Sequence, residues 1–259
     1  MDITIETVMQ CGRAAFAQGD HAAAEQHFRD ALAGGRDDAD VHHHLGFIAR
    51  TGGDLAVAAA RYADALEHAP NDPYLHNNFG ETRRAQGLFA EAAALFRRGL
   101  HLAPDAAPIA ANLGSLLIAM RRHDLALPHL EHAAALDPSQ LQVLSEIALC
   151  LCSMNRYQDA LAFYRRIYAA KPSANDARYL ESLALLALGD FANGWRKHES
   201  RWYAHLGRPL RRVAPGPYWL GESDLTGRTI LVHAEQGHGD TIQYLRYIPL
   251  LRQQAARVI

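Results

Sequence analysis

Apolar and small residues recur along the chain in pairs of helix-length segments, each closed by a glycine or a proline. The segment VHHHLGFIARTGG sets apolar residues among polar ones over the length of a helix and ends at Gly52 and Gly53. The next segment, DLAVAAARYADALEHAP, ends at Pro70. Glycine closes many helices and proline cannot continue one, so the pattern predicts two helices joined by a turn.

The paired segments repeat every 34 residues, and several positions keep the same register. A small-residue column comprises Gly12, Gly46, Gly80, Gly114, Ala148 and Ser182. Further columns comprise Pro70, Pro104, Pro138 and Pro172, and Ala24, Ala58, Ala92, Ala126 and Ala160. A large-residue column comprises Phe28, Tyr62, Phe96, Leu130 and Tyr164. Helices approach to about 8 Å only where side chains are short. We therefore expect the small residues to pack the helices of one repeat together, and the large residues to fill the junctions between repeats.

The segment LGFIARTGGDLAVAAARYADALEHAP resembles the tetratricopeptide repeat in its Leu-Gly, Gly-Asp, Ala, Tyr, Ala-Leu and Pro. The resemblance implies a mainly α protein, a right-handed superhelix (α-solenoid) of helix-turn-helix repeats, and covers residues 1–172 as five repeats. Residues 173–206 are expected to form a degenerate sixth repeat or capping helices. Arg121 and Asn155 depart from the family pattern, because each replaces a turn glycine.

One position per repeat, two residues before the small-residue column, is polar. This polar column comprises Gln10, His44, Asn78, Asn112 and Glu146. The first helices of stacked repeats line a concave groove in which such arrays bind partners. A side-chain amide both donates and accepts, so the column is a candidate for clamping a protein or an extended peptide. Asn78 and Asn112 resemble the asparagine ladder of the O-linked N-acetylglucosamine transferases, and we expect both to point into the groove. Alternatively, the column only contacts water or bonds to neighbouring helices.

The 15 histidines raise the question of a metal site, which their spacing answers in the negative. His42, His43 and His44 are consecutive, so on a helix they point to different sides, whereas a helical metal pair needs a spacing of three or four residues. His129 and His132 have that spacing but lack a third ligand on their face. We therefore expect no metal.

After the repeats, the sequence pattern changes from paired helices to a linker followed by alternating strand and helix. Residues 207–226 are rich in glycine and proline and are expected to form a linker. Residues 227–259 then read as the start of an incomplete α/β domain, with a buried strand from Thr229 to Ala234, a glycine turn, a helix capped by Asp240 and Thr241, and a second strand at 257–259. This order is typical of a partial Rossmann-like unit, whose turn suits anions. The residues of that candidate anion or acceptor loop are Gly237, His238 and Gly239.

The string GRTILVHAEQGHGDTIQYLRYIPLL resembles the point where tetratricopeptide repeats join a heptosyltransferase-like glycosyltransferase domain in bacterial proteins. The resemblance implies a two-lobed GT-B fold, a nucleotide-sugar donor in a longer parent protein, and Asp240 as a candidate general base. The chain is expected to be truncated within the first lobe and to need no cofactor itself. Two functions stay open: a scaffold that binds a protein or peptide, and a glycosyltransferase active only in the longer parent.

Charge and hydropathy argue against two other classes of protein, those that bind nucleic acid and those that span a membrane. The chain has 26 Lys and Arg against 28 Asp and Glu, so its net charge of -2 provides no overall positive field for nucleic acid. No apolar run approaches the roughly 18 residues that cross a bilayer. The acidic start MDITIETVMQ is unlike a signal peptide, and we expect a cytoplasmic location.

Overall fold

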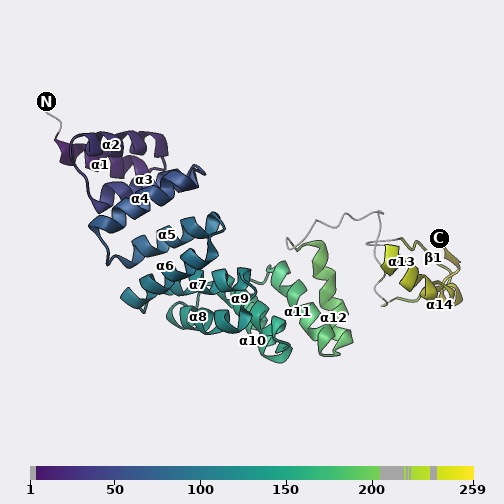
Figure 1. The fold of residues 1–259 in the computed structure, drawn as a ribbon. Helices are drawn as coiled ribbons and strands as arrows, with labels where there is room; N and C mark the ends of the chain where they lie inside the picture. Colours follow the sequence, from purple (N-terminus) through teal and green to yellow (C-terminus); the bar gives the residue numbers. More distant parts are fainter. Residues whose placement is uncertain (1–3, 205–218, 220, 222, 234–237) are drawn as a thin grey trace.

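Helices make up most of the structure and occur as hairpins stacked one after another along a curved path (Figure 1). The computed structural model describes residues 4–204, 219, 221, 223–233 and 238–259. Its first three hairpins are α1 (Ile5–Ala17) with α2 (His21–Ala33), α3 (Ala39–Thr51) with α4 (Leu55–His68), and α5 (Pro73–Ala85) with α6 (Phe89–Leu102). The next three are α7 (Ala107–Ala119) with α8 (His123–Leu136), α9 (Leu141–Ser153) with α10 (Tyr157–Ala170), and α11 (Asn175–Ala187) with α12 (Phe191–His198). The expected helical solenoid is therefore confirmed.

The turn inside each hairpin depends on one residue in the left-handed backbone region. In four hairpins this residue is a glycine, with φ between 78° and 86°, namely Gly19, Gly53, Gly87 and Gly189. In the fourth and fifth hairpins Arg121 and Asn155 occupy the same place, with φ of 61° and 60°. A side chain with a Cβ is strained in this region, although asparagine tolerates it better than other residues.

Between hairpins, each second helix from α4 to α10 ends two residues before the repeated proline. The residue directly before the proline leaves the helical region, with φ between -134° and -139° and ψ between 69° and 91°, at Ala69, Ala103, Asp137 and Lys171. The pyrrolidine ring disfavours helical geometry in its predecessor, which explains this common ending. The predicted helix stops are confirmed.

The two helices of a hairpin lock together where the small-residue column meets the large-residue column. A Cβ on Gly80 would lie 2.8 Å from Cε1 of Phe96, and a Cβ on Gly46 would lie 3.1 Å from Cε1 of Tyr62. The large residues are at most 1% exposed. These close contacts lie within one hairpin, whereas the sequence pattern predicts the large residues at the junctions between repeats.

The sixth hairpin replaces this apolar contact with polar ones. Ser182 and His198 occupy the small and the large positions, and the Ser182 Oγ lies 3.2 Å from the His198 Nδ1 in a hydrogen bond. Glu181, which is only 3% exposed, pairs with Lys197 from α12. A 3-10 turn, η1 (Glu199–Trp202), follows the short α12. The sixth hairpin therefore adds a hydrogen bond and an ion pair at the position where the others pack a large residue, while Gly194 packs closely against Leu186.

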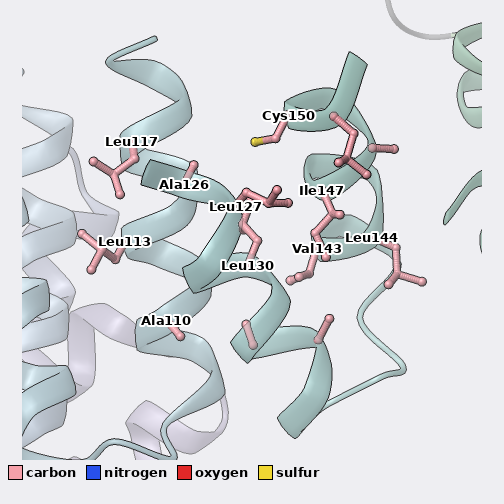
Figure 2. Packing of buried hydrophobic residues seen from close by; sticks show 14 of the residues in the cluster. Ala110, Leu113, Leu117, Ala126, Leu127, Leu130, Val143, Leu144, Ile147 and Cys150 are labelled. Atoms are coloured by element: carbon pink, nitrogen blue, oxygen red, sulfur yellow. The ribbon is translucent and has the colours of Figure 1, made fainter. Parts of the chain in front are cut away.

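The largest buried cluster runs through the later hairpins, from α6 to α11. Figure 2 shows Leu127 and Leu130 of α8 lying between Leu113 of α7 and Ile147 of α9. Second helices thus pack against the first helix of their own hairpin and that of the next hairpin. From α6 to α11 the core is one cluster, and two smaller clusters lie in the early hairpins, one from α1 to α3 and one across α4 and α5, so each cluster joins neighbouring hairpins.

The C-terminal segment contains a short strand, helices and a second strand. Its elements are β1 (Thr229–Ile230), α13 (His238–Tyr244), the 3-10 turn η2 (Leu245–Tyr247), α14 (Ile248–Gln254) and β2 (Arg257–Val258). The strands pair in parallel, with Thr229 opposite Arg257 and Ile230 opposite Val258. β1 is shorter than the predicted strand that ends at Ala234. Pro249 lies in the first turn of α14, where its missing N–H costs nothing, so the predicted single helix is divided.

We predict that Arg121→Gly stabilises the array by about 0.5–1 kcal/mol. Removal of the Cβ relieves about 1–2 kcal/mol of left-handed strain, and the greater freedom of glycine in the unfolded chain offsets about 0.4–1 kcal/mol of it. Asn155→Gly is the matched control, because asparagine is less strained, and its melting temperature should change less. Thermal unfolding followed by circular dichroism measures both. A lower melting temperature for Arg121→Gly than for the unmodified chain would contradict the strain argument.

Candidate functional site

The first helices of successive hairpins form one continuous surface, which we call the first-helix face. α3 contacts α5, α5 contacts α7, and α7 contacts α9, in addition to the contacts within each hairpin. The polar column lies on the first helices of hairpins one to five, one residue in each, because its spacing equals the repeat length. In the sixth hairpin the same position is Leu180, so the first-helix face presents this polar position five times.

The two asparagines of the polar column join neighbouring first helices. The Asn78 Nδ2 donates to the Nε2 of His43 over 3.0 Å, and the Asn112 Nδ2 donates to the Oδ1 of Asn77 over 2.9 Å. Burial lowers the pKa of His43, which favours the neutral ring that this hydrogen bond needs as an acceptor. Each bond runs from one hairpin to the hairpin before it, so the column also aligns the repeats.

Glu146 continues the pattern with a carboxylate. Its Oε2 accepts a hydrogen bond from the Oγ of Ser115 on α7 over 2.6 Å. Its Oε1 accepts from the Nε2 of Gln142 over 3.0 Å. Glu146 is therefore held between two donors, one of which belongs to the preceding hairpin.

His44 and Gln10 differ from the other members of the column, because His44 bonds within its own helix and Gln10 lies in the first hairpin, which no hairpin precedes. His43 and Asn77 accept the hydrogen bonds of Asn78 and Asn112. The equivalent position in the first hairpin is Met9, which is buried and apolar. The ring of His44 instead stacks on Phe28, with centroids 4.6 Å apart, and its Nδ1 bonds to the carbonyl oxygen of Asp40 over 2.8 Å. Gln10 lies in the first hairpin and is exposed.

Charges on the first-helix face gather in the early hairpins. Arg13 on α1 pairs with Asp40 on α3 over 2.5 Å, and Arg50 on α3 pairs with Glu81 on α5 over 3.2 Å. The guanidinium of Arg50 also lies 5.2 Å from the centre of the Phe47 ring. Ion pairs thus supplement the amide hydrogen bonds between these repeats.

The later hairpins carry exposed leucines in place of these charges. Leu149 on α9 and Leu183 on α11 are one repeat apart and are 40% and 41% exposed. Both belong to the position that Arg13, Phe47, Glu81 and Ser115 occupy in the earlier hairpins. The 34-residue register of the sequence reveals that this position is leucine only in the last two hairpins.

The predicted catalytic and anion-binding residues belong to the C-terminal segment. Gly237 lies outside the described residues. His238 and Gly239 lie in the first turn of α13 and not in the predicted loop. Asp240 lies within α13, so the prediction that it caps this helix is wrong.

The structure also brings together three groups that spacing along the sequence did not connect. Asp37 precedes α3, His42 lies in α3 and His68 ends α4. The Nε2 atoms of His42 and His68 lie 2.6 Å and 3.3 Å from the Oδ1 of Asp37. The hydrogen bond with His42 holds the pKa of Asp37 below its ordinary value. The expectation of no metal considered ligands within one helix, whereas these three come from a loop and two helices.

Within the described part of the chain, no helix has the length and apolar character that crossing a bilayer requires.

Two sequence families, both described as tetratricopeptide repeat, match the chain, one over residues 15–78 and the other over 111–175 and 153–194. The curated relative Protein FlbA of Caulobacter vibrioides is 35% identical over 72 residues, which are 28% of this chain and 12% of FlbA. The match thus spans only about an eighth of that relative's length.

Solved structures agree on the fold. The structure of pilF from Pseudomonas aeruginosa has a TM-score of 0.68 at 20% identity, covering 78% of this chain and 92% of that one. YrrB, described as a TPR protein with an unusual peptide-binding site, has a TM-score of 0.61 at 20% identity, covering 67% and 89%. A MamA structure has a TM-score of 0.56 at 23% identity, covering 65% and 96%. At these identities the likeness concerns the fold alone. The two family matches together span more than half of the chain, which is therefore a tetratricopeptide-repeat protein.

Proposed function

We propose that the chain is a scaffold that binds a protein or an extended peptide along its first-helix face. The observation that carries this proposal is the polar column, which recurs in the first five hairpins and whose members from His44 to Glu146 lie on the contacting helices α3, α5, α7 and α9. Asn78 and Asn112 each use one N–H to reach the preceding hairpin. A side-chain amide has two N–H donors and an oxygen acceptor, so both asparagines keep capacity for a partner's backbone.

The hydrogen bonds between repeats support the proposal because they fix the amides before a partner arrives. A side chain that is already ordered loses less conformational entropy when it binds, and such a loss costs about 0.5–1.5 kcal/mol for a mobile side chain. Glu146 has the same support through Ser115 of the preceding hairpin, whereas His44 is held within its own helix by the carbonyl oxygen of Asp40. The similar fold of YrrB, a TPR protein with an unusual peptide-binding site, supports a peptide as the class of partner.

The change along the first-helix face indicates the partner's chemistry. Charged pairs mark the early hairpins, and the exposed Leu149 and Leu183 mark the later ones. A complementary segment has polar or charged side chains toward one end and apolar side chains toward the other. Backbone hydrogen bonds to the amides provide affinity, and the leucines select apolar side chains.

We predict that the double variant Asn78→Ala/Asn112→Ala binds a partner peptide at least about tenfold more weakly, since each lost hydrogen bond is worth about 1 kcal/mol. The probe is a peptide selected on the full chain from a displayed random library, and fluorescence anisotropy measures its affinity. Leu149→Gln should also weaken a peptide that carries apolar side chains. Two matched controls lie off the face: Asn71→Ala before α5, and Leu125→Gln on α8.

The control variants should keep the affinity within about twofold, because neither side chain lies on a first helix. Melting temperatures identify any variant that loses affinity through unfolding. Selected peptides that bind the double asparagine variant as tightly as the unmodified chain would refute the clamp. Equal losses for Leu125→Gln and Leu149→Gln would place the binding surface elsewhere.

A second candidate function is glycosyl transfer, and the parallel pairing of β1 with β2 around α13 and α14 favours it. Strand, helix and parallel strand are the opening of a Rossmann-like lobe. Together with the resemblance to heptosyltransferase-like domains, this supports a role as the arm of a bacterial glycosyltransferase. The scaffold would then bring a protein acceptor to a domain that takes a nucleotide-sugar donor.

We predict that residues 1–259 alone transfer no sugar and that a longer protein with both lobes does so through Asp240. Transfer depends on alignment of donor and acceptor, which one strand pair cannot provide. In the longer protein, Asp240→Asn should lower turnover by about 100-fold or more at unchanged melting temperature, because the amide cannot accept a proton. Turnover measured with the true acceptor and unaffected by this substitution would rule out the role as general base.

A further inference from the structure

We propose that Asp37, His42 and His68 form a zinc-binding site at the start of the second hairpin. The three side chains converge from the connection between α2 and α3, from α3, and from the end of α4. Their ligand atoms all lie within 4.8 Å of one another. Two imidazoles and one carboxylate are a ligand set that Zn²⁺ accepts, and a water molecule can fill a fourth position.

The distances suit a tetrahedral ion after a small adjustment. Bonds of about 2.0 Å at tetrahedral angles place neighbouring ligand atoms about 3.3 Å apart. The Nε2 of His68 already lies 3.3 Å from the Oδ1 of Asp37. The Nε2 of His42 is closer, at 2.6 Å, because it shares a hydrogen bond with the same oxygen. Zn²⁺ would replace that proton and separate the two atoms.

Burial divides the three ligands into one fixed and two adjustable groups. The side chain of His42 is 6% exposed, whereas those of Asp37 and His68 are 62% and 38% exposed. The rings of His42 and His68 are nearly parallel and stacked, with centroids 5.8 Å apart, so the ring of His68 must turn for its Nε2 lone pair to point at an ion on His42. His42 therefore fixes the position of the ion, and the other two close on it from the solvent side.

Asp64 places a carboxylate beside the ring nitrogen of His42 that faces away from the proposed ion. Histidines that bind metals usually donate their other ring N–H to a carboxylate or a carbonyl, which fixes the tautomer. The Nδ1 of His42 lies 3.5 Å from the Oδ2 of Asp64. The Nη1 of Arg61 donates to this Nδ1 over 3.5 Å and pairs with Asp64 over 3.6 Å, so zinc binding at Nε2 requires the His42 proton to move to Nδ1 and turn from Arg61 to Asp64. His42 thus presents its Nε2 to the site while its Nδ1 faces Asp64.

The repeat pattern does not account for these residues, since the equivalent positions of the third repeat are Asn71, His76 and Leu102. The Nε2 of His76 bonds to the carbonyl oxygen of Pro70 over 3.0 Å. A histidine at this position can therefore be held without a carboxylate or a second ring. His76 provides a matched internal control, being the same residue type at the same place in the fold.

The test is calorimetric titration of the untagged full chain with Zn²⁺ alone. We expect one equivalent to bind, and we expect His68→Gln and Asp37→Asn each to lower the affinity by at least about tenfold. Both side chains are exposed enough for the variants to fold, which circular dichroism checks. His76→Gln should bind Zn²⁺ within about twofold of the unmodified chain. Co²⁺ should give the visible absorption of a tetrahedral site in the unmodified chain and lose it in His68→Gln.

Three outcomes would overturn the proposal. The chain binds no Zn²⁺, in which case the two histidines only hydrogen-bond to Asp37. It binds one equivalent that His68→Gln and Asp37→Asn leave unchanged, so the ion lies at other histidines. Or His76→Gln weakens binding as much as His68→Gln, which would place the ion outside the second hairpin.

Discussion

The contact between a small residue on the first helix and a large residue on the second sets the geometry of the first five hairpins. In four of them the small residue is a glycine, and the space that its Cβ would fill belongs to a buried ring or leucine. Short side chains let the helices approach closely, and the large residue then fills the gap that remains. Because the contact recurs every 34 residues, neighbouring hairpins stack on one another, and from α6 to α11 their buried residues form one cluster. The sixth hairpin, with Ser182 and His198 at these positions, ends the series with a hydrogen bond.

Other features follow from this register. Once the small-residue column faces the second helix, the residue two positions earlier turns toward the first helix of the preceding hairpin. Asn78, Asn112 and Glu146 all bond in that direction, whereas His44 bonds to the carbonyl oxygen of Asp40 within its own helix. The same residues therefore hold the repeats together and present polar atoms on the first-helix face. A partner that binds there meets side chains whose positions the array has already fixed.

Sequence periodicity predicted the helical architecture well, because 34-residue spacing, glycine turns and proline stops are local signals. It did not predict which neighbour Phe96 touches most closely, since packing partners depend on helix crossing in three dimensions. The polar column was visible as a register, but its bonds to His43 and Asn77 were one of two alternatives. Asp37, His42 and His68 were missed because they are five and 26 residues apart and meet only when α4 returns to the start of α3. In the C-terminal segment, Pro249 and an earlier helix start at His238 changed the predicted elements, because short helices take their bounds from few interactions.

The most direct test of the central contact compares Gly80→Ala with Gly52→Ala by chemical unfolding. An added Cβ at position 80 would lie 2.8 Å from the fully buried ring of Phe96, whereas at Gly52, an exposed helix end, the nearest atom is 3.4 Å away. Alanine gains about 1 kcal/mol over glycine within a helix, and overpacking costs about 1–3 kcal/mol. We predict that Gly80→Ala lowers the free energy of unfolding by up to about 2 kcal/mol and that Gly52→Ala leaves it unchanged or raises it slightly. A Gly80→Ala chain as stable as the Gly52→Ala chain would contradict the account.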